Sequence, residues 1–126
     1  MKTVLISVSI FILILAIAIT YQMYLTDIAT DFNDYAEQIQ HQVTMQNFDE
    51  AEKALNNLEK LWNKNSSFLM MFHDHSLINN ASVNIELAVN SFKDKHFDET
   101  VSYLIYFIAT IDELTAENRP TFENIL

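Results

Sequence analysis

The chain has 126 residues with no Gly, no Cys and one Pro, and its 17 acidic residues against 7 basic ones give a formal charge of -10 at pH 7. The lack of Gly excludes P-loops, Rossmann fingerprints and nucleophile elbows, because each needs a backbone at positive φ or in close contact with a ligand. The lack of Cys excludes thiol catalysis, disulfides, cysteine zinc sites and a lipidated cysteine anchor. We expect no nucleic-acid binding, since an acidic surface is repelled by phosphate backbones.

The first segment is typical of a membrane anchor. Residues 4–21 carry no charge. Extension of this helix to about Leu25 gives roughly 33 Å, close to the ~30 Å hydrocarbon core of a bilayer. Tyr21 and Tyr24 lie where an interfacial aromatic belt is expected. The membrane is therefore an expected partner, contacted through residues 4–25.

Flanking charge predicts the orientation of this anchor. Lys2 precedes the apolar run and Asp27 and Asp31 follow it, so the positive-inside rule places the N-terminus in the cytoplasm and the remainder outside the cell membrane. The alternative is a cleaved signal peptide, since Ala16-Ile17-Ala18 has the small-x-small form that signal peptidase recognises.

Apolar residues after the anchor recur every three or four positions, which indicates amphipathic helices. Four such stripes follow one another: Ile28, Phe32, Tyr35, Ile39 and Val43; Phe48, Ala51, Leu55, Leu58 and Trp62; Ile78, Ala81, Ile85, Ala88 and Phe92; and Val101, Leu104, Ile105, Ile108, Ile111 and Leu114. The anchor helix is expected to run on into the first of them, and the last helix to end near Pro120.

The predicted fold is therefore all-α, with an N-terminal transmembrane helix followed by a four-helix domain made of two antiparallel helical hairpins. We assign residues 1–25 to the transmembrane anchor and residues 26–126 to the extracytoplasmic domain. Within that domain the first hairpin covers about 27–72, the second about 76–118, and a C-terminal tail 119–126.

The two hairpin junctions are the same in sequence. Phe48-Asp49-Glu50 and Phe97-Asp98-Glu99 are identical and 49 residues apart, and the apolar register on both sides matches at that offset. This predicts an internal duplication, although any two amphipathic hairpins share some register. We expect Asn47 to take a left-handed helix-terminal conformation, Asp49 and Asp98 to cap the following helices, and Phe48 and Phe97 to be core residues whose replacement by Asp unfolds the domain.

The order of these features resembles a small bacterial family catalogued as domain of unknown function 4363. The resemblance rests on the apolar anchor, the step from Phe48 to Glu52, Leu61-Trp62 followed by Lys64, and His75, together with Asn124-Ile125-Leu126. This chain has Ser76-Leu77-Ile78-Asn79 where family members follow the His with an acidic-acidic-Leu-Asp run. The resemblance implies a single-pass envelope protein without an assigned activity, working beside a larger membrane protein.

His73-Asp74-His75 is the densest group of potential metal ligands. Two His residues separated by one position lie about 200° apart on a helix, so they share a metal only in a non-helical stretch. The favoured interpretation is a turn in which Asp74 or His75 caps the third helix, with His75 as a buried structural histidine. We therefore expect no metal and no cofactor.

Two further features have competing interpretations. Trp62 is the single Trp and is expected in the core, the alternative being an exposed anchor for a partner. The tail that contains Asn124 ends in two aliphatic residues, so it is expected to dock between helices; the alternative is capture by another protein.

No residue is predicted to be catalytic, because neighbouring carboxylates such as Asp112-Glu113 do not face each other on a helix. The leading hypothesis is a noncatalytic membrane-anchored envelope protein that acts as an interaction or accessory module for another membrane or envelope protein. The alternatives are an extracytoplasmic helical ligand sensor, or a metal-binding protein that uses His73, Asp74 and His75.

Overall fold

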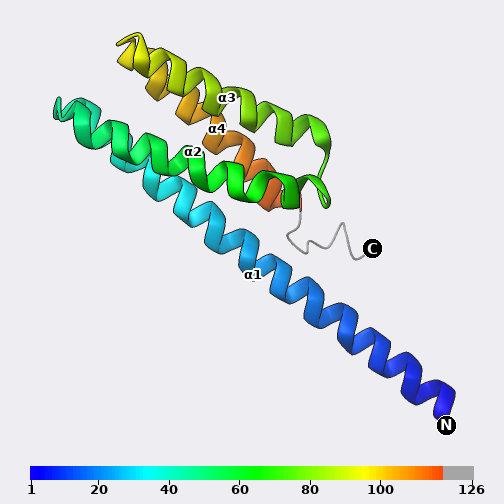
Figure 1. Cartoon of the computed structure of the whole chain (residues 1–126). Helices are drawn as coiled ribbons and strands as arrows, with labels where there is room; N and C mark the ends of the chain where they lie inside the picture. The colour runs from blue at the N-terminus through cyan, green and yellow to red at the C-terminus, as the bar shows by residue number, and fades with distance from the viewer. Residues whose placement is uncertain (118–126) are drawn as a thin grey trace.

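The computed structural model describes residues 1–117, and all the regular structure in this range is helical (Figure 1). The elements in chain order are α1 (Lys2–Thr44), α2 (Phe48–Met70), α3 (His75–Lys93) and α4 (Phe97–Glu117). The all-α prediction is thereby confirmed. The predicted tail, 119–126, and its Asn124 lie outside the described residues.

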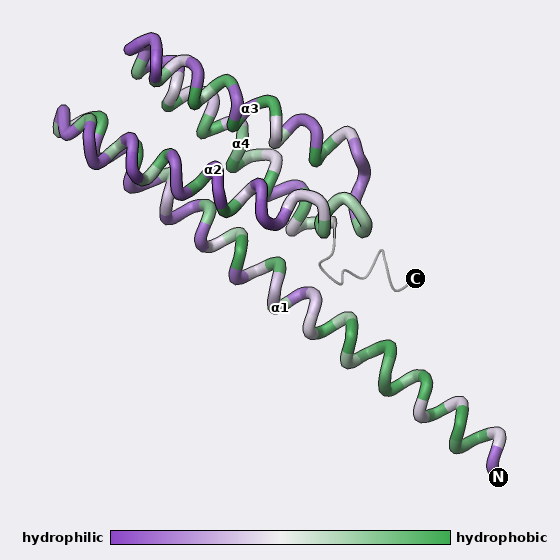
Figure 2. The backbone as a smooth tube through the Cα atoms, viewed as in Figure 1, coloured by the Kyte–Doolittle hydropathy of each residue, from purple (hydrophilic) through white to green (hydrophobic). Residues whose placement is uncertain are grey.

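One helix, α1, serves both as the predicted anchor and as the first helix of the bundle. Its N-terminal half extends away from the other helices (Figure 1) and is apolar along its length (Figure 2). Leu25 is its first buried residue. By length and composition, α1 is the helix among residues 1–117 that is able to cross a membrane, and its most apolar window is entirely unburied. The charge that begins at Asp27 does not interrupt the helix.

The four helices form an up-down-up-down bundle. Helix α1 packs against α2 and α4, and α3 packs against the same two helices. The predicted hairpins are therefore α1 with α2 and α3 with α4 (Figure 1). We call the end with the α1–α2 and α3–α4 junctions the distal end. The proximal end holds the α2–α3 turn, on the side of the bundle from which the apolar half of α1 extends.

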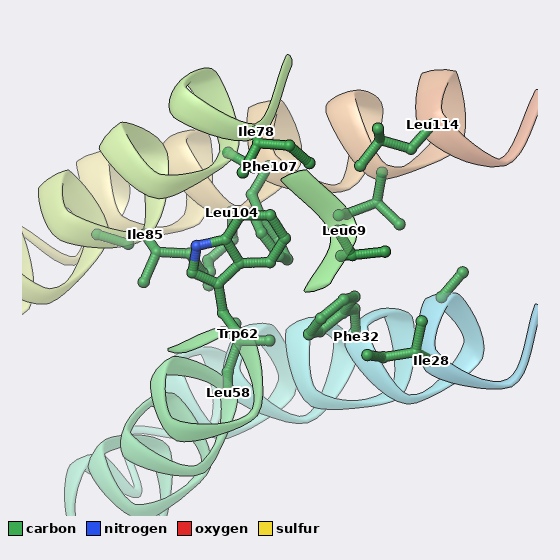
Figure 3. Packing of buried hydrophobic residues seen from close by; sticks show 14 of the residues in the cluster. Ile28, Phe32, Leu58, Trp62, Leu69, Ile78, Ile85, Leu104, Phe107 and Leu114 are labelled. Atoms are coloured by element: carbon green, nitrogen blue, oxygen red, sulfur yellow. The ribbon is translucent and has the colours of Figure 1, made fainter. Parts of the chain in front are cut away.

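The core is built around three aromatic rings contributed by three helices (Figure 3). Phe32, Trp62 and Phe107 are almost fully buried, with ring centroids 5.3 to 5.8 Å apart. The indole N–H of Trp62 donates to the hydroxyl of Ser82 at 2.9 Å, so the polar atom of the indole is satisfied inside the bundle. The prediction of Trp62 as a core residue is confirmed.

Both distal junctions close in the same way. Gln46 and Lys95, which are 49 residues apart, have positive φ angles of 60° and 62°. At each junction the residue that follows donates its N–H to a carbonyl five residues earlier, as in a Schellman ending. These bonds join Asn47 to Gln42 at 2.9 Å and His96 to Ser91 at 2.8 Å.

This geometry corrects the predicted caps. Asn47 has φ -88° and is the N-cap of α2, without a side-chain capping bond, so the left-handed position belongs to Gln46. Asp49 and Asp98 lie in the first turns of α2 and α4 and are not N-caps. The backbone Schellman bonds place the N-cap of α2 at Asn47, two residues before the predicted cap at Asp49, and the carboxylates complement the helix dipoles instead.

Phe48 and Phe97 stack on each other at the distal end, with ring centroids 4.2 Å apart and an interplanar angle of 12°. Phe48 is 37% exposed. The prediction of Phe48 as a core residue is therefore wrong. The side chain lies at the first position of α2, at the distal end, where its ring stacks on its counterpart from the other hairpin.

Candidate functional site

The turn between α2 and α3 contains the predicted metal candidates. Asp74 is the N-cap of α3, and its Oδ1 accepts the backbone N–H of Ser76 at 2.9 Å. This hydrogen bond holds the pKa of the Asp74 carboxyl below its usual range. Of the two residues predicted as the cap of the third helix, Asp74 or His75, the structure has Asp74, and its carboxylate accepts the capping hydrogen bond.

His73, not His75, is the buried histidine of the turn. Its side chain is 8% exposed, and its Nε2 lies 2.6 Å from the hydroxyl oxygen of Tyr21 on α1. His75 is exposed at the first position of α3, so the prediction of a buried His75 is wrong. That prediction extended the helical stripe of Met71 across a turn, where the 3.6-residue period no longer applies.

The three predicted metal candidates do not come together as a ligand group within residues 1–117. No group of three or more His, Asp or Glu side chains among residues 1–117 is placed to hold an ion. Because a catalytic zinc needs about three protein ligands, the contacts of His73, Asp74 and His75 explain the turn without one.

At the proximal end, four aromatic rings pack together between α1 and the end of α2. We call this cluster the aromatic collar; it consists of Tyr21, Tyr24, Phe68 and Phe72. The ring of Tyr21 lies 4.8 Å from that of Phe72, and the ring of Tyr24 lies 5.3 Å from that of Phe68, edge-on. The hydroxyl of Tyr24 donates to Asn65 Oδ1 at 2.7 Å. These contacts hold the end of α2 against α1.

A groove of about 590 Å³ runs along the collar. Its walls combine the collar and Asn65 with Ala16, Ile17 and Thr20, which belong to the apolar half of α1. The polar groups at this groove are hydroxyl and amide groups, and several are already bonded within the chain: Thr20 to the carbonyl of Ala16 and Tyr24 to Asn65. The groove therefore suits an apolar occupant.

The outward face of α4 is a second candidate site. Ile105 and Tyr106 are 57% and 59% exposed, and no charged residue lies between Glu99 and Asp112. A shallow groove of about 160 Å³ between α1 and α4 borders this face.

The exposure of this face was not predicted from the sequence, because Ile105 was placed on the inward stripe of α4. The buried apolar residues of that helix are Leu104, Phe107, Ile111 and Leu114. No charged residue marks the solvent side of α4 between Glu99 and Asp112, so the sequence pattern did not show that Ile105 faces outward. The 49-residue offset could have found it, since Leu55 and Leu58 predict burial of Leu104 and Phe107 and leave Ile105 outside.

The neighbouring carboxylates give no acid–base pair. Asp49-Glu50 and Asp98-Glu99 are exposed in the first turns of α2 and α4, and Asp112-Glu113 is exposed near the end of α4. Adjacent helical positions point in different directions. The features with built geometry are therefore the aromatic collar and the α4 face, both of them contact surfaces.

The comparisons with known proteins identify a family. A family model described as Domain of unknown function (DUF4363) matches residues 19–125, which includes the collar, the four-helix bundle and both distal junctions. No curated protein and no solved structure matches the chain. The expected resemblance is confirmed, and this chain belongs to the DUF4363 family of domains of unknown function.

Proposed function

We propose that this chain is a noncatalytic, single-pass membrane protein whose bundle, outside the cell, presents the face of α4 to another membrane or envelope protein. The observation that carries the proposal is the difference between α4 and its counterpart α2. The two helices occupy equivalent places in the two hairpins. The outward face of α2 therefore serves as the reference for a solvent-exposed helix face at that place in the hairpin.

The counterparts on the two outward faces differ in chemistry. At the 49-residue offset, Asn56 corresponds to Ile105, Asn57 to Tyr106, and Lys60 to Ala109. All six positions are exposed. The face of α2 is thus solvated, whereas that of α4 is apolar at the same positions. An exposed aromatic residue beside an aliphatic one, framed by acidic residues at both ends of the helix, is typical of a protein contact with a polar rim.

The chemistry of the described residues supports a noncatalytic role. The buried polar side chains Ser91 and Thr100 bond to each other at 2.8 Å, and Trp62 bonds to Ser82. These four polar side chains are thereby used in packing. The carboxylates that stand in pairs are solvated, so none has the environment that tunes a general acid or base.

The length and composition of α1 support the membrane placement, and Lys2 ahead of the apolar run with Asp27 after it supports an internal N-terminus. The natural lack of Cys makes the topology directly testable. Thr3→Cys and Lys93→Cys variants are treated in intact cells with a membrane-impermeant maleimide.

We expect labelling of the Lys93→Cys variant in intact cells, and labelling of the Thr3→Cys variant after permeabilisation. The reverse pattern would contradict the orientation. Loss of the N-terminal cysteine from the mature protein, seen in its intact mass, would show a cleaved signal peptide and rule out the anchor.

The partner contact is tested by photo-crosslinking in native membranes. A photoreactive amino acid is placed at Ile105, and the matched control places it at Asn56, the equivalent position on α2. We expect adducts with a second protein from position 105 and none from position 56. Equal adducts from both positions, or none from 105, would contradict the proposal. An adduct of twice the chain's own mass would assign the face to self-association instead.

A further inference from the structure

We propose that the aromatic collar and the α2–α3 turn sit in the membrane, so that phospholipid acyl chains of the leaflet nearest the bundle fill the groove along Ala16, Ile17 and Phe72. This inference rests on the proposal that α1 crosses the bilayer. It adds that the bundle is seated on the membrane surface by its own side chains and is not held away from it on a free stalk.

The depth of the collar follows from the continuity of α1. The helix runs without a break from Lys2 to Thr44. At 1.5 Å per residue, Tyr21 lies about 29 Å along the axis from Lys2, which is close to the ~30 Å thickness of the hydrocarbon core. Because the Phe72 ring lies 4.8 Å from that of Tyr21, Phe72 is placed at the boundary between hydrocarbon and headgroups.

Three large apolar side chains are exposed at this end, beside the polar residues Asp74, His75 and Ser76. Phe68, Phe72 and Met71 are 43%, 53% and 75% exposed at the turn in which His73 is buried. In water this exposure is unfavourable. At the bilayer boundary it becomes favourable, and aromatic rings are enriched at that depth.

The groove points to the same occupant. Ala16, Ile17 and Thr20 form one of its walls, and they belong to the segment that faces lipid if α1 spans the bilayer. The groove is thus continuous with the lipid-facing surface of α1, and a neighbouring acyl chain reaches it without leaving the hydrocarbon.

The charges at this end indicate that the contact is apolar and does not depend on anionic lipid. From Asn65 to Ile85 the one charged residue is Asp74. However, the C-terminal end of α4 lies at this end of the bundle (Figure 1), and Asp112 and Glu113 in the last turns of α4 repel anionic headgroups. We therefore expect the contact to form with the zwitterionic lipid phosphatidylcholine.

The experiment places a single environment-sensitive fluorophore on the full chain in phosphatidylcholine vesicles. Three variants carry the label: Met71→Cys in the turn, Ile10→Cys in the apolar half of α1, and Lys95→Cys at the distal end as the matched exposed control. Quenching is measured with lipid that carries a nitroxide on the upper acyl chain and, separately, with aqueous iodide.

We expect the lipid nitroxide to reduce the emission from positions 10 and 71 and to leave that from position 95 unchanged, with iodide showing the opposite order. Phe72→Ser in the Met71→Cys background should reduce the lipid quenching at position 71.

Lipid quenching at position 10 together with full iodide quenching at position 71 would overturn the inference while leaving the anchor intact. Protection of position 71 from both quenchers would show that protein covers the turn, and would also overturn it. Absence of lipid quenching at position 10 would refute the anchor itself.

Discussion

The stacked pair Phe48–Phe97 provides a quantitative test of how the two hairpins hold each other at the distal end. A fully buried Phe contributes about 1.5–3 kcal/mol. Since Phe48 is 37% exposed, its burial contributes roughly 1–2 kcal/mol. The stack with Phe97, at 4.2 Å between ring centroids, adds about 0.5–1.5 kcal/mol. Phe48→Ala should therefore lower the free energy of unfolding by roughly 1.5–3.5 kcal/mol.

This loss is smaller than the ~5–15 kcal/mol typical of a folded domain. Phe48→Ala should therefore leave the bundle folded, in contrast to the unfolding predicted from sequence for a polar residue at this position. The assay is a double-mutant cycle on the full chain in detergent micelles, with urea unfolding followed by circular dichroism. The variants are Phe48→Ala, Phe97→Ala and the combined variant.

The double variant should lose about 0.5–1.5 kcal/mol less than the sum of the two single losses, because the stack is removed once in either background. Phe107→Ala is the buried control, with an expected loss of about 3–5 kcal/mol and no coupling to Phe48. Strictly additive single losses would refute the stack as the link between the hairpins, and complete unfolding by Phe48→Ala would refute the magnitude.

Two further predictions concern the helix ends. Gln46→Gly and Lys95→Gly should each raise the free energy of unfolding by about 1 kcal/mol in the same urea assay, because Gly adopts positive φ without the cost that a Cβ imposes; destabilisation at both sites would contradict the junction geometry. The hydrogen bond from Ser76 lowers the folded-state pKa of Asp74 below 3.8, so its stabilising effect is complete above the unfolded-state pKa and is lost as pH falls through the lower, folded-state pKa. Thermal melts between neutral and acid pH should show a shallower acid loss for Asp74→Ala, and an unchanged profile would exclude this cap as a source of pH dependence.

The helices were predictable because each has an apolar face that is buried away from water in the bundle. Residues such as Phe32 and Leu58 recur with helical spacing and are buried as expected. The single helix α1 was expected in outline, since no helix-breaking residue separates the apolar run from the first stripe. Its two halves differ in the medium they face and not in backbone conformation, which is why a change of composition at Asp27 leaves the helix unbroken.

At the first junction the left-handed position was predicted one residue too late, and the N-cap two residues too late. Residue preference favours Asn in a left-handed conformation and Asp as a cap, but the junctions close through backbone hydrogen bonds that any residue is able to make. Gln46 and Lys95 therefore occupy the positive-φ positions. Their equal spacing follows the duplicated sequence, so the repeat predicted that the junctions match, while residue preference alone did not predict how they close.

The contacts of the α2–α3 turn depend on tertiary structure, so they could not be predicted from the spacing of residues within the turn. His73 and Tyr21 are 52 positions apart in sequence and meet through their polar atoms at 2.6 Å. No periodicity within the turn distinguishes His73 from His75, because the choice depends on which side of the turn faces α1. The assignment of the buried histidine therefore had to come from the packed bundle.

The internal repeat is most informative where its two copies differ. Both hairpins bury equivalent positions, such as Leu58 and Phe107. In both, the two helices are joined by a turn with a left-handed residue at the equivalent position. The requirements of folding therefore account for what the copies share. They do not account for an exposed Ile105 where the first hairpin has Asn56, nor for the extension of α1 far beyond the length of α3. The two differences lie in the surfaces that we propose to contact a protein partner and the membrane. At these positions the residues are better explained by a functional contact than by the stability of the bundle.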